Sequence, residues 1–185
     1  NVPLNTSNII YYMDPSVTFI AFNNTHPNDP VFNMGLTTTF IHNVSMIGSS
    51  ESNKFVIDTT NGFARRGIQL YGIDGFLLTN IEILVKVTNQ NARSAICFDY
   101  NRISITLLYH AMNGKVINIT ASDYPAGYGL TQVQSGENIY FENLDGTGGN
   151  TLRMETGAGY QDGYVGNITA NNVICRNGHA ALSSS

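Results

Sequence analysis

A recurring pattern along the chain places an Asn directly before an aliphatic residue, with apolar and polar residues alternating on either side. It occurs in residues 40–46, 78–83, 116–120, 141–145 and 165–169. Such alternation indicates β-strands with one buried face. The residues concerned are Asn43, Asn80, Asn118, Asn143 and Asn167, separated by 37, 38, 25 and 24 positions.

A repeat of this kind, with longer copies that carry insertions, predicts a β-solenoid, in which each coil buries its apolar face against the next coil. The repeated Asn would lie at a turn, where its amide bonds the equivalent Asn one coil away at the strand spacing of about 4.8 Å. Further strands are expected at residues 67–71, 129–134 and 151–156, joined by Gly-rich turns such as 145–149.

We interpret residues 1–185 as a single all-β domain, a right-handed parallel β-helix of about five or six coils and a fragment of a longer helix. Residues 1–35 hold four of the five prolines and are expected to form an irregular cap or entry segment, with stacked coils over 36–185. Helical support is expected near Ser104 to Met112. A β-sandwich is the alternative. It is less favoured than the β-helix, because the repeats are spaced 24 to 38 residues apart and lack regular hairpin turns.

Composition and charge narrow the functional classes. Only 12% of the 185 residues are charged, against a usual fraction of about 25%, and Gly, Asn, Ser and Thr are abundant, which points away from helices. The hydrophobic fraction of 42% is too high for a disordered chain, so a soluble, folded protein is expected. The nine Lys and Arg residues are scattered and the net charge is −4, which argues against a nucleic-acid partner. No apolar run approaches the roughly 20 residues of a membrane span, so no membrane association is expected.

Two features bear on the cellular compartment. Cys97 and Cys175 both lie in apolar stretches, which indicates two buried thiols, with a disulfide as the alternative. N-glycosylation triplets begin at Asn5, Asn23, Asn43, Asn118 and Asn167. Because Asn, Ser and Thr are abundant in this chain, such triplets also arise by chance. They are compatible with a secreted protein without establishing one.

Candidate chemistry is concentrated in residues 152–157, Leu-Arg-Met-Glu-Thr-Gly. If Leu152 and Met154 point inward, Arg153, Glu155 and Gly157 face outward on the same side of the strand. A Glu beside an Arg on an exposed face could protonate a glycosidic oxygen, and a surface ion pair is the alternative reading. A parallel β-helix also displays a long flat face that suits an extended polysaccharide, although a fold alone does not assign a function.

Several stretches resemble one family of enzymes. They are residues 127–132 (Gly-Tyr-Gly-Leu-Thr-Gln), 137–144 (Glu-Asn-Ile-Tyr-Phe-Glu-Asn-Leu), 148–156 (Gly-Gly-Asn-Thr-Leu-Arg-Met-Glu-Thr), 166–175 and 180–182. Together they resemble the core of the iota-carrageenases of glycoside hydrolase family 82, over about residues 67–185. The resemblance implies a secreted right-handed β-helix enzyme that cuts β-1,4 linkages of sulfated red-algal galactans, such as carrageenan, with inversion.

The resemblance also implies roles for individual residues. Glu155 would be the general acid, and Gln132 would lie beside it as a polar partner one coil earlier. Arg153 would meet a substrate sulfate with both arms of its guanidinium group. The remaining substrate-binding candidates are Gln134, Tyr128 and Tyr160.

One departure from the family pattern concerns the base. The pattern continues Glu-Thr-Asp, and that Asp, about 6.6 Å along the strand, would activate the water. This chain has Gly157 at that position, and Gly has no side chain to accept a proton. Asp162 is a weak substitute, because an Asp before a Gly more often forms a turn.

Other functions therefore stay open at this point. Without a base, the protein would be a catalytically inactive carbohydrate-binding or structural β-helix. A tailspike-like adhesin or a fibre subunit, self-associating through the helix ends, is a further alternative.

No cofactor is expected from the sequence, and no metal site. His26, His42, His110 and His179 lack the spacing of a metal site. A structural calcium ion in the Asp-containing turns stays open, although no ligand series of defined spacing is present.

Overall fold

The computed structural model describes residues 2–20, 30–36, 38–60, 66–85, 94–99, 101–104, 107–156 and 163–184. Every regular element in these ranges is a β-strand. In chain order the strands are β1 (Val2–Leu4), β2 (Ile9–Met13), β3 (Thr18–Ile20), β4 (Pro30–Gly35), β5 (Ile41–Gly48), β6 (Phe55–Asp58), β7 (Arg66–Tyr71), β8 (Ile73–Leu84), β9 (Ile96–Phe98), β10 (Asn101–Ser104), β11 (Leu107–Tyr109), β12 (Ala111–Val133), β13 (Gly136–Met154), β14 (Val165–Arg176) and β15 (Ala180–Ser184). These ranges contain no helix that could cross a membrane.

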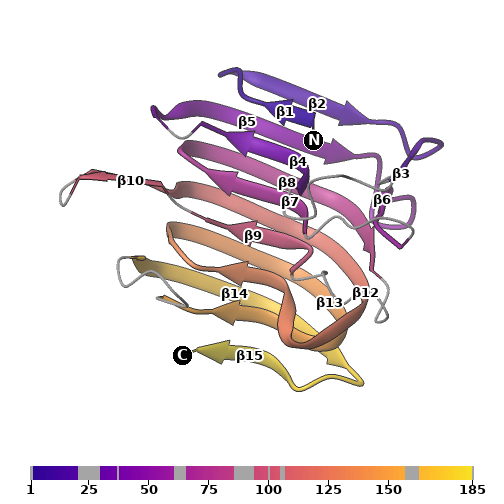
Figure 1. Ribbon diagram of the computed structural model, residues 1–185. Coiled ribbons are helices and arrows are strands. Elements are labelled where there is room, and N and C mark those ends of the chain that lie inside the picture. The colour runs from indigo at the N-terminus through magenta and orange to yellow at the C-terminus, as the bar shows by residue number, and fades with distance from the viewer. Residues whose placement is uncertain are drawn as a thin grey trace.

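Thirteen strands form one curled sheet in which all pairings between strands are parallel (Figure 1). Row A stacks β1, β4, β7, β9, the C-terminal part of β12, the C-terminal part of β13, and β15. Row B stacks β2, β5, β8 and the N-terminal parts of β12 and β13, and ends with β14. A third row stacks β3, β6, the C-terminal part of β8, residues 119–122 of β12, residues 144–147 of β13 and the C-terminal part of β14. The chain passes through the rows in turn, which is the path of a parallel β-helix. The expectation of an all-β parallel fold is therefore confirmed, and the β-sandwich is excluded because its sheets are antiparallel.

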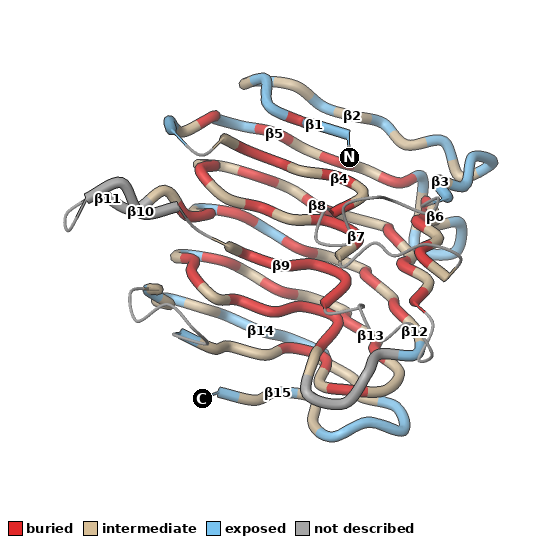
Figure 2. Tube along the Cα trace, viewed as in Figure 1, coloured by how far each residue is buried: buried red, intermediate tan, exposed pale blue. Residues whose placement is uncertain are grey.

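The core lies between the rows, where the inward residues of successive coils stack in columns (Figure 2). One column of row A contains Phe32, Ile68, Ile96, Thr131 and Leu152, in register from strand to strand and almost fully buried. Alternation along each strand makes the intervening residues face outward. The apolar positions predicted from the sequence thus form a continuous interior, and their burial is the main favourable term for this fold.

Two Asn ladders mark the turns at the two ends of each row B segment. In the first ladder, Nδ2 of Asn43 donates to Oδ1 of Asn8 at 3.0 Å. Further along the stack, Asn138 donates to Asn113 at 3.0 Å and Asn167 donates to Asn138 at 2.9 Å in the same way. Each of these Asn residues has a positive φ between 50° and 59°. Asn tolerates this left-handed conformation better than most residues do.

The second ladder runs five residues further along the chain. Nδ2 of Asn118 donates to Oδ1 of Asn80 at 3.1 Å, Asn143 donates to Asn118 at 2.9 Å, and Asn172 donates to Asn143 at 2.7 Å. The expected bond between equivalent Asn residues is thus present. The expectation of one series was wrong, because Asn43 and Asn167 belong to the first ladder and only the other three to the second.

Two local expectations differ from the structure. The segment near Ser104 to Met112 is not helical where it is described: β10 and β11 pair as an antiparallel hairpin, and β12 begins at Ala111. The irregular cap expected over residues 1–35 is a regular coil over its described strands, because β1, β2 and β3 pair in parallel register with β4, β5 and β6. Its prolines are compatible with this, since Pro3 and Pro30 lie at strand positions near the end of the stack.

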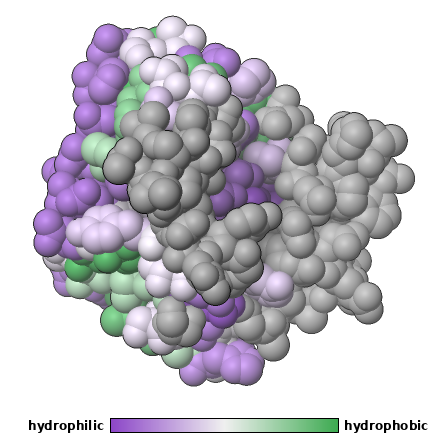
Figure 3. Space-filling view, turned by 60° about the vertical axis from the view of Figure 1, so that its left-hand side comes forward, coloured by the Kyte–Doolittle hydropathy of each residue, from purple (hydrophilic) through white to green (hydrophobic). Residues whose placement is uncertain are grey.

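Both cysteines are thiols, as expected. Cys97 is buried, whereas Cys175 is only half-buried, with its Sγ donating to the carbonyl oxygen of Gly149 at 3.7 Å. On the side of the molecule in Figure 3, hydrophilic residues cover most of the described surface and hydrophobic residues form small separate areas. With only 12% charged residues in the chain, uncharged polar side chains such as Asn, Ser and Thr must supply much of that surface.

Candidate functional site

The candidate site lies on the outward face of row A, at the C-terminal ends of its strands. One outward column consists of Gln69, Cys97, Gln132 and Arg153, which are directly opposite one another in register. The next outward column, two residues further along each strand, contains Asp99, Gln134 and Glu155. The backbone ladder extends to that column, because the N–H of Gln134 donates to Phe98 at 3.0 Å and that of Glu155 to Val133 at 2.9 Å.

Glu155 is held by two donors. Nε2 of Gln132, one coil earlier, donates to Oε2 of Glu155 at 2.8 Å, and Nη2 of Arg153 donates to Oε1 at 2.8 Å. Leu152 is fully buried and Met154 packs against the core, so the alternation expected for this strand is present. The side chains of Arg153 and Glu155 are 20% and 15% exposed, which leaves the carboxyl group partly desolvated but reachable from outside.

Gln132 is itself oriented by a third residue. It is only 3% exposed, and its Oε1 accepts a hydrogen bond from Oγ of Ser94 at 3.4 Å. Since that oxygen faces Ser94, the amide nitrogen is turned toward Glu155. Ser94 carried no functional signal in the sequence, because a Ser in a loop before a strand has many structural roles.

A second cluster, in which a Gln and an Arg again contact a carboxylate, lies on row A directly after β9. Oδ2 of Asp99 accepts from Nε2 of Gln69 at 3.0 Å and lies 3.4 Å from Nη1 of Arg66, which also donates to Oε1 of Gln69 at 3.0 Å. The sequence analysis did not single out these residues. The available signal was a carboxyl residue directly after a strand: Asp99 follows β9 as Glu155 follows β13.

The remaining predicted site residues fall in three places. Gln134 lies in the Glu155 column and accepts a hydrogen bond from Sγ of Cys97 at 3.7 Å. Tyr128 is half-buried and lies in β12, four residues before Gln132. Gly157, Tyr160 and Asp162 lie outside the described residues.

Other titratable groups lie outside this cluster. His110, between β11 and β12, is 8% exposed, and neither ring nitrogen has a hydrogen-bond partner in the described part of the chain. Burial lowers its pKa from the ordinary value, and the negative charge of Glu137 opposes that effect. Across the described ranges, no three His, Cys, Asp or Glu residues are grouped so as to hold a metal ion.

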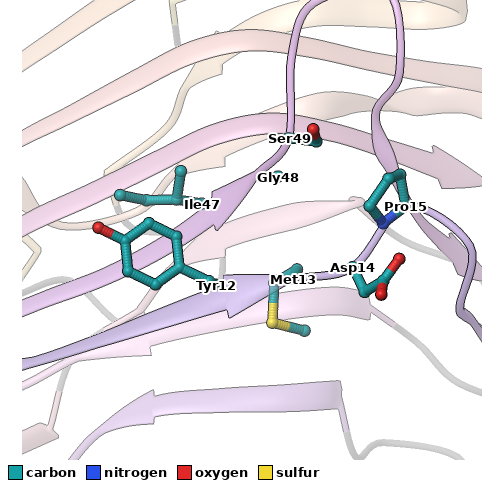
Figure 4. A pocket seen from close by; sticks show the side chains of 7 residues that line it. All are labelled: Tyr12, Met13, Asp14, Pro15, Ile47, Gly48 and Ser49. Carbon is teal, nitrogen blue, oxygen red and sulfur yellow. The ribbon is translucent and has the colours of Figure 1, made fainter.

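An open depression at the other end of the stack is lined by Tyr12, Met13, Asp14, Pro15, Ile47, Gly48 and Ser49 (Figure 4). It lies where β2 and β5 end, in the first coils, whereas Glu155 follows β13 near the last coils (Figure 1). The only charged side chain among these seven is Asp14, whose Oδ1 accepts hydrogen bonds from the N–H and the hydroxyl of Ser16. It is therefore not part of the Glu155 site.

Similar proteins were found by sequence and by structure. No family model matches the chain. The iota-carrageenase of Alteromonas macleodii is 29% identical over 178 residues, which cover 88% of this chain and 33% of the relative. The iota-carrageenase of Zobellia galactanivorans is 30% identical over 118 residues, or 63% of this chain and 23% of the relative.

Among solved structures, an iota-carrageenase of glycoside hydrolase family 82 from A. fortis superimposes with a TM-score of 0.81 and 27% identity, over 96% of this chain and 38% of that chain. The chain has an iota-carrageenase-like fold. An iota-carrageenase complexed to iota-carrageenan fragments gives a TM-score of 0.80, again at 27% identity, over 95% of this chain and 38% of that chain. The resemblance to family 82 is therefore confirmed. The chain spans between about a quarter and a third of the length of its curated iota-carrageenase relatives.

Proposed function

We propose that this protein is a secreted glycoside hydrolase that cleaves β-1,4 linkages of a sulfated galactan, such as iota-carrageenan, with inversion. The observation that carries the proposal is the carboxyl group of Glu155, held on the outward face of row A between Gln132 and Arg153. The iota-carrageenase relatives support a carrageenan-active hydrolase. The proposed location is extracellular, because a long polysaccharide chain does not enter a cell.

In the proposed reaction Glu155 is the general acid that protonates the glycosidic oxygen. In the structure each of its oxygens accepts one hydrogen bond, which leaves a second lone pair on each oxygen for the proton to be donated. We assign substrate binding to Arg153, whose guanidinium group would bind a sulfate of the incoming substrate beside Glu155. Gln132, whose amide group is oriented by Ser94, would hold the Glu155 side chain in place while the substrate binds.

The polymer would lie along the outward face of row A, with Gln134, Tyr128 and Tyr160 as further binding residues. Tyrosine rings offer an apolar face and a polar tip to sugar rings. We also propose that the fold is right-handed, with about five or six coils, and part of a longer helix. Acid–base hydrolysis of this kind uses carboxyl groups alone, so no cofactor is proposed.

The test is a reducing-end assay of the full-length protein on iota-, kappa- and lambda-carrageenan. Glu155→Gln should lower the release of oligosaccharides by about 10²- to 10⁴-fold, the usual effect of removing a general acid. Glu142→Gln, on row B, is the matched control and should keep the wild-type rate. Equal rates in wild type and Glu155→Gln would refute the role of Glu155. Binding without release by the wild type would instead establish a catalytically inactive binding module.

A further inference from the structure

The site described so far contains an acid without a base. Family 82 enzymes, by the resemblance above, would place an Asp two residues after Glu155, where this chain has Gly157. An inverting hydrolase needs a second carboxylate about 6.5–9.5 Å from the acid, so that a water molecule fits between the carboxylate and the sugar. The described part of row A holds a second carboxylate in the same outward column as Glu155, in a place that the sequence did not suggest.

Asp99 lies in the same outward column as Glu155. The N–H of Asp99 donates to Leu70, that of Gln134 to Phe98 and that of Glu155 to Val133, which are successive steps of one parallel ladder. Asp99, Gln134 and Glu155 are therefore consecutive along the stack. Two strand spacings of about 4.8 Å separate the backbones of Asp99 and Glu155 by about 9.6 Å, close to the upper end of the range for inverting enzymes.

The two carboxylates also have the same support. Each receives a hydrogen bond from the amide of a Gln in the preceding coil, and each is paired with an Arg. The Asp99 side chain is 26% exposed and that of Arg66 15%, so Asp99 is open to the outward face and its negative charge is compensated. Phe98, the residue before it, is fully buried in the core and fixes the direction in which Asp99 points.

We propose that Asp99 is the general base of this hydrolase, in place of the carboxylate missing at Gly157. This assignment rests on the proposed function. The Asp99 carboxylate takes a proton from a water molecule while the water oxygen forms a bond to the anomeric carbon. The bond from that carbon to the glycosidic oxygen breaks, and the oxygen takes its electron pair and the proton of Glu155. One water is consumed, and exchange with solvent restores both carboxyl groups.

Gln134, between the two carboxyl groups, is the positioning residue. Its Oε1 accepts from Sγ of Cys97, so its Nε2 remains as a donor on the outward side. A donor at this point would orient the attacking water or a substrate hydroxyl without taking part in proton transfer.

The experiment compares Asp99→Asn and Asp99→Ala with wild type and Glu155→Gln in the full-length protein. Asp74→Asn, which removes an exposed carboxylate on row B, is the control. Wild-type activity on iota-carrageenan is measured first, because its absence would refute the proposed function and not this assignment. Both Asp99 variants should then lose about 10²- to 10⁴-fold in kcat while binding of the polysaccharide, measured by affinity electrophoresis, stays within threefold.

Sodium azide separates a base from a structural role. Azide attacks the anomeric carbon without needing a base, so it should restore turnover in Asp99→Ala and form a galactosyl azide of inverted configuration. It should not restore Glu155→Gln, which lacks the proton donor. A rate in Asp99→Asn within tenfold of wild type would overturn the assignment. So would a loss in both Asp99 variants that azide does not rescue, because a misfolded or mispositioned site cannot be repaired by a nucleophile.

Discussion

The second Asn ladder predicts a specific order of stability among variants of Asn118. This side chain donates to Asn80 at 3.1 Å and accepts from Asn143 at 2.9 Å, and its φ is 56°. Removing the side chain loses two hydrogen bonds of about 1 kcal/mol each. Alanine also pays about 1 kcal/mol for the left-handed backbone, whereas glycine does not. The free energy of unfolding should fall by about 2 kcal/mol in Asn118→Gly and by about 3 kcal/mol in Asn118→Ala.

Thermal unfolding measured by circular dichroism at one scan rate is a suitable assay. For a chain of this length, 1 kcal/mol corresponds to a shift in Tm of about 2–4 °C, so the two variants should differ from wild type by about 4–8 °C and 6–12 °C. Asn172, which makes a single ladder bond and is exposed, is the control. Its Gly variant should lose about 1 kcal/mol. An Asn118→Ala variant as stable as Asn118→Gly would refute the argument from backbone conformation, and an Asn172→Gly effect equal to that of Asn118→Gly would refute the argument from the ladder.

Three further predictions concern charge, substrate and modification. Burial lowers the pKa of His110 in the folded state, so as the pH falls the unfolded chain binds a proton at this residue before the folded chain does. The Tm should therefore decline as the pH falls below about 6.5. His110→Gln should make this decline of Tm with pH less steep, whereas the exposed control His179→Gln should leave it unchanged. Glu137→Gln, which removes the charge that favours protonated His110, should make the decline steeper. Arg153→Lys should raise KM on iota-carrageenan about tenfold with kcat changed less than threefold, because Lys cannot bind a sulfate with two parallel donors; an unchanged KM would mean that Arg153 does not bind substrate. Asn118 should be unglycosylated in folded protein recovered from a glycosylating host, as mass spectrometry of its peptide would show, because a glycan on its Nδ2 would disrupt the ladder contacts with Asn80 and Asn143 and prevent folding.

The candidate site shows how far a local pattern reaches. The alternation around Leu152 and Met154 was sufficient to place Arg153 and Glu155 on one outward face, because side-chain direction in a strand depends only on position parity. Gln132 could be placed beside Glu155 only through the family resemblance. Ser94 had no local signal of its own, and Asp99 had only its position directly after a buried strand, since the roles of both depend on which strands become neighbours.

The sequence by itself determined the kind of structure: alternating apolar residues specify strands, and the repeated Asn before an aliphatic residue specifies stacked turns. These are local properties of consecutive residues. The tertiary structure alone decided which turns stack, because the loops between strands vary in length and the register follows from pairing in space. For that reason Asn143 bonds Asn172 and not Asn167, although both precede an aliphatic residue. The same pairing brings Asp99 into the column of Glu155, 56 residues further along the chain.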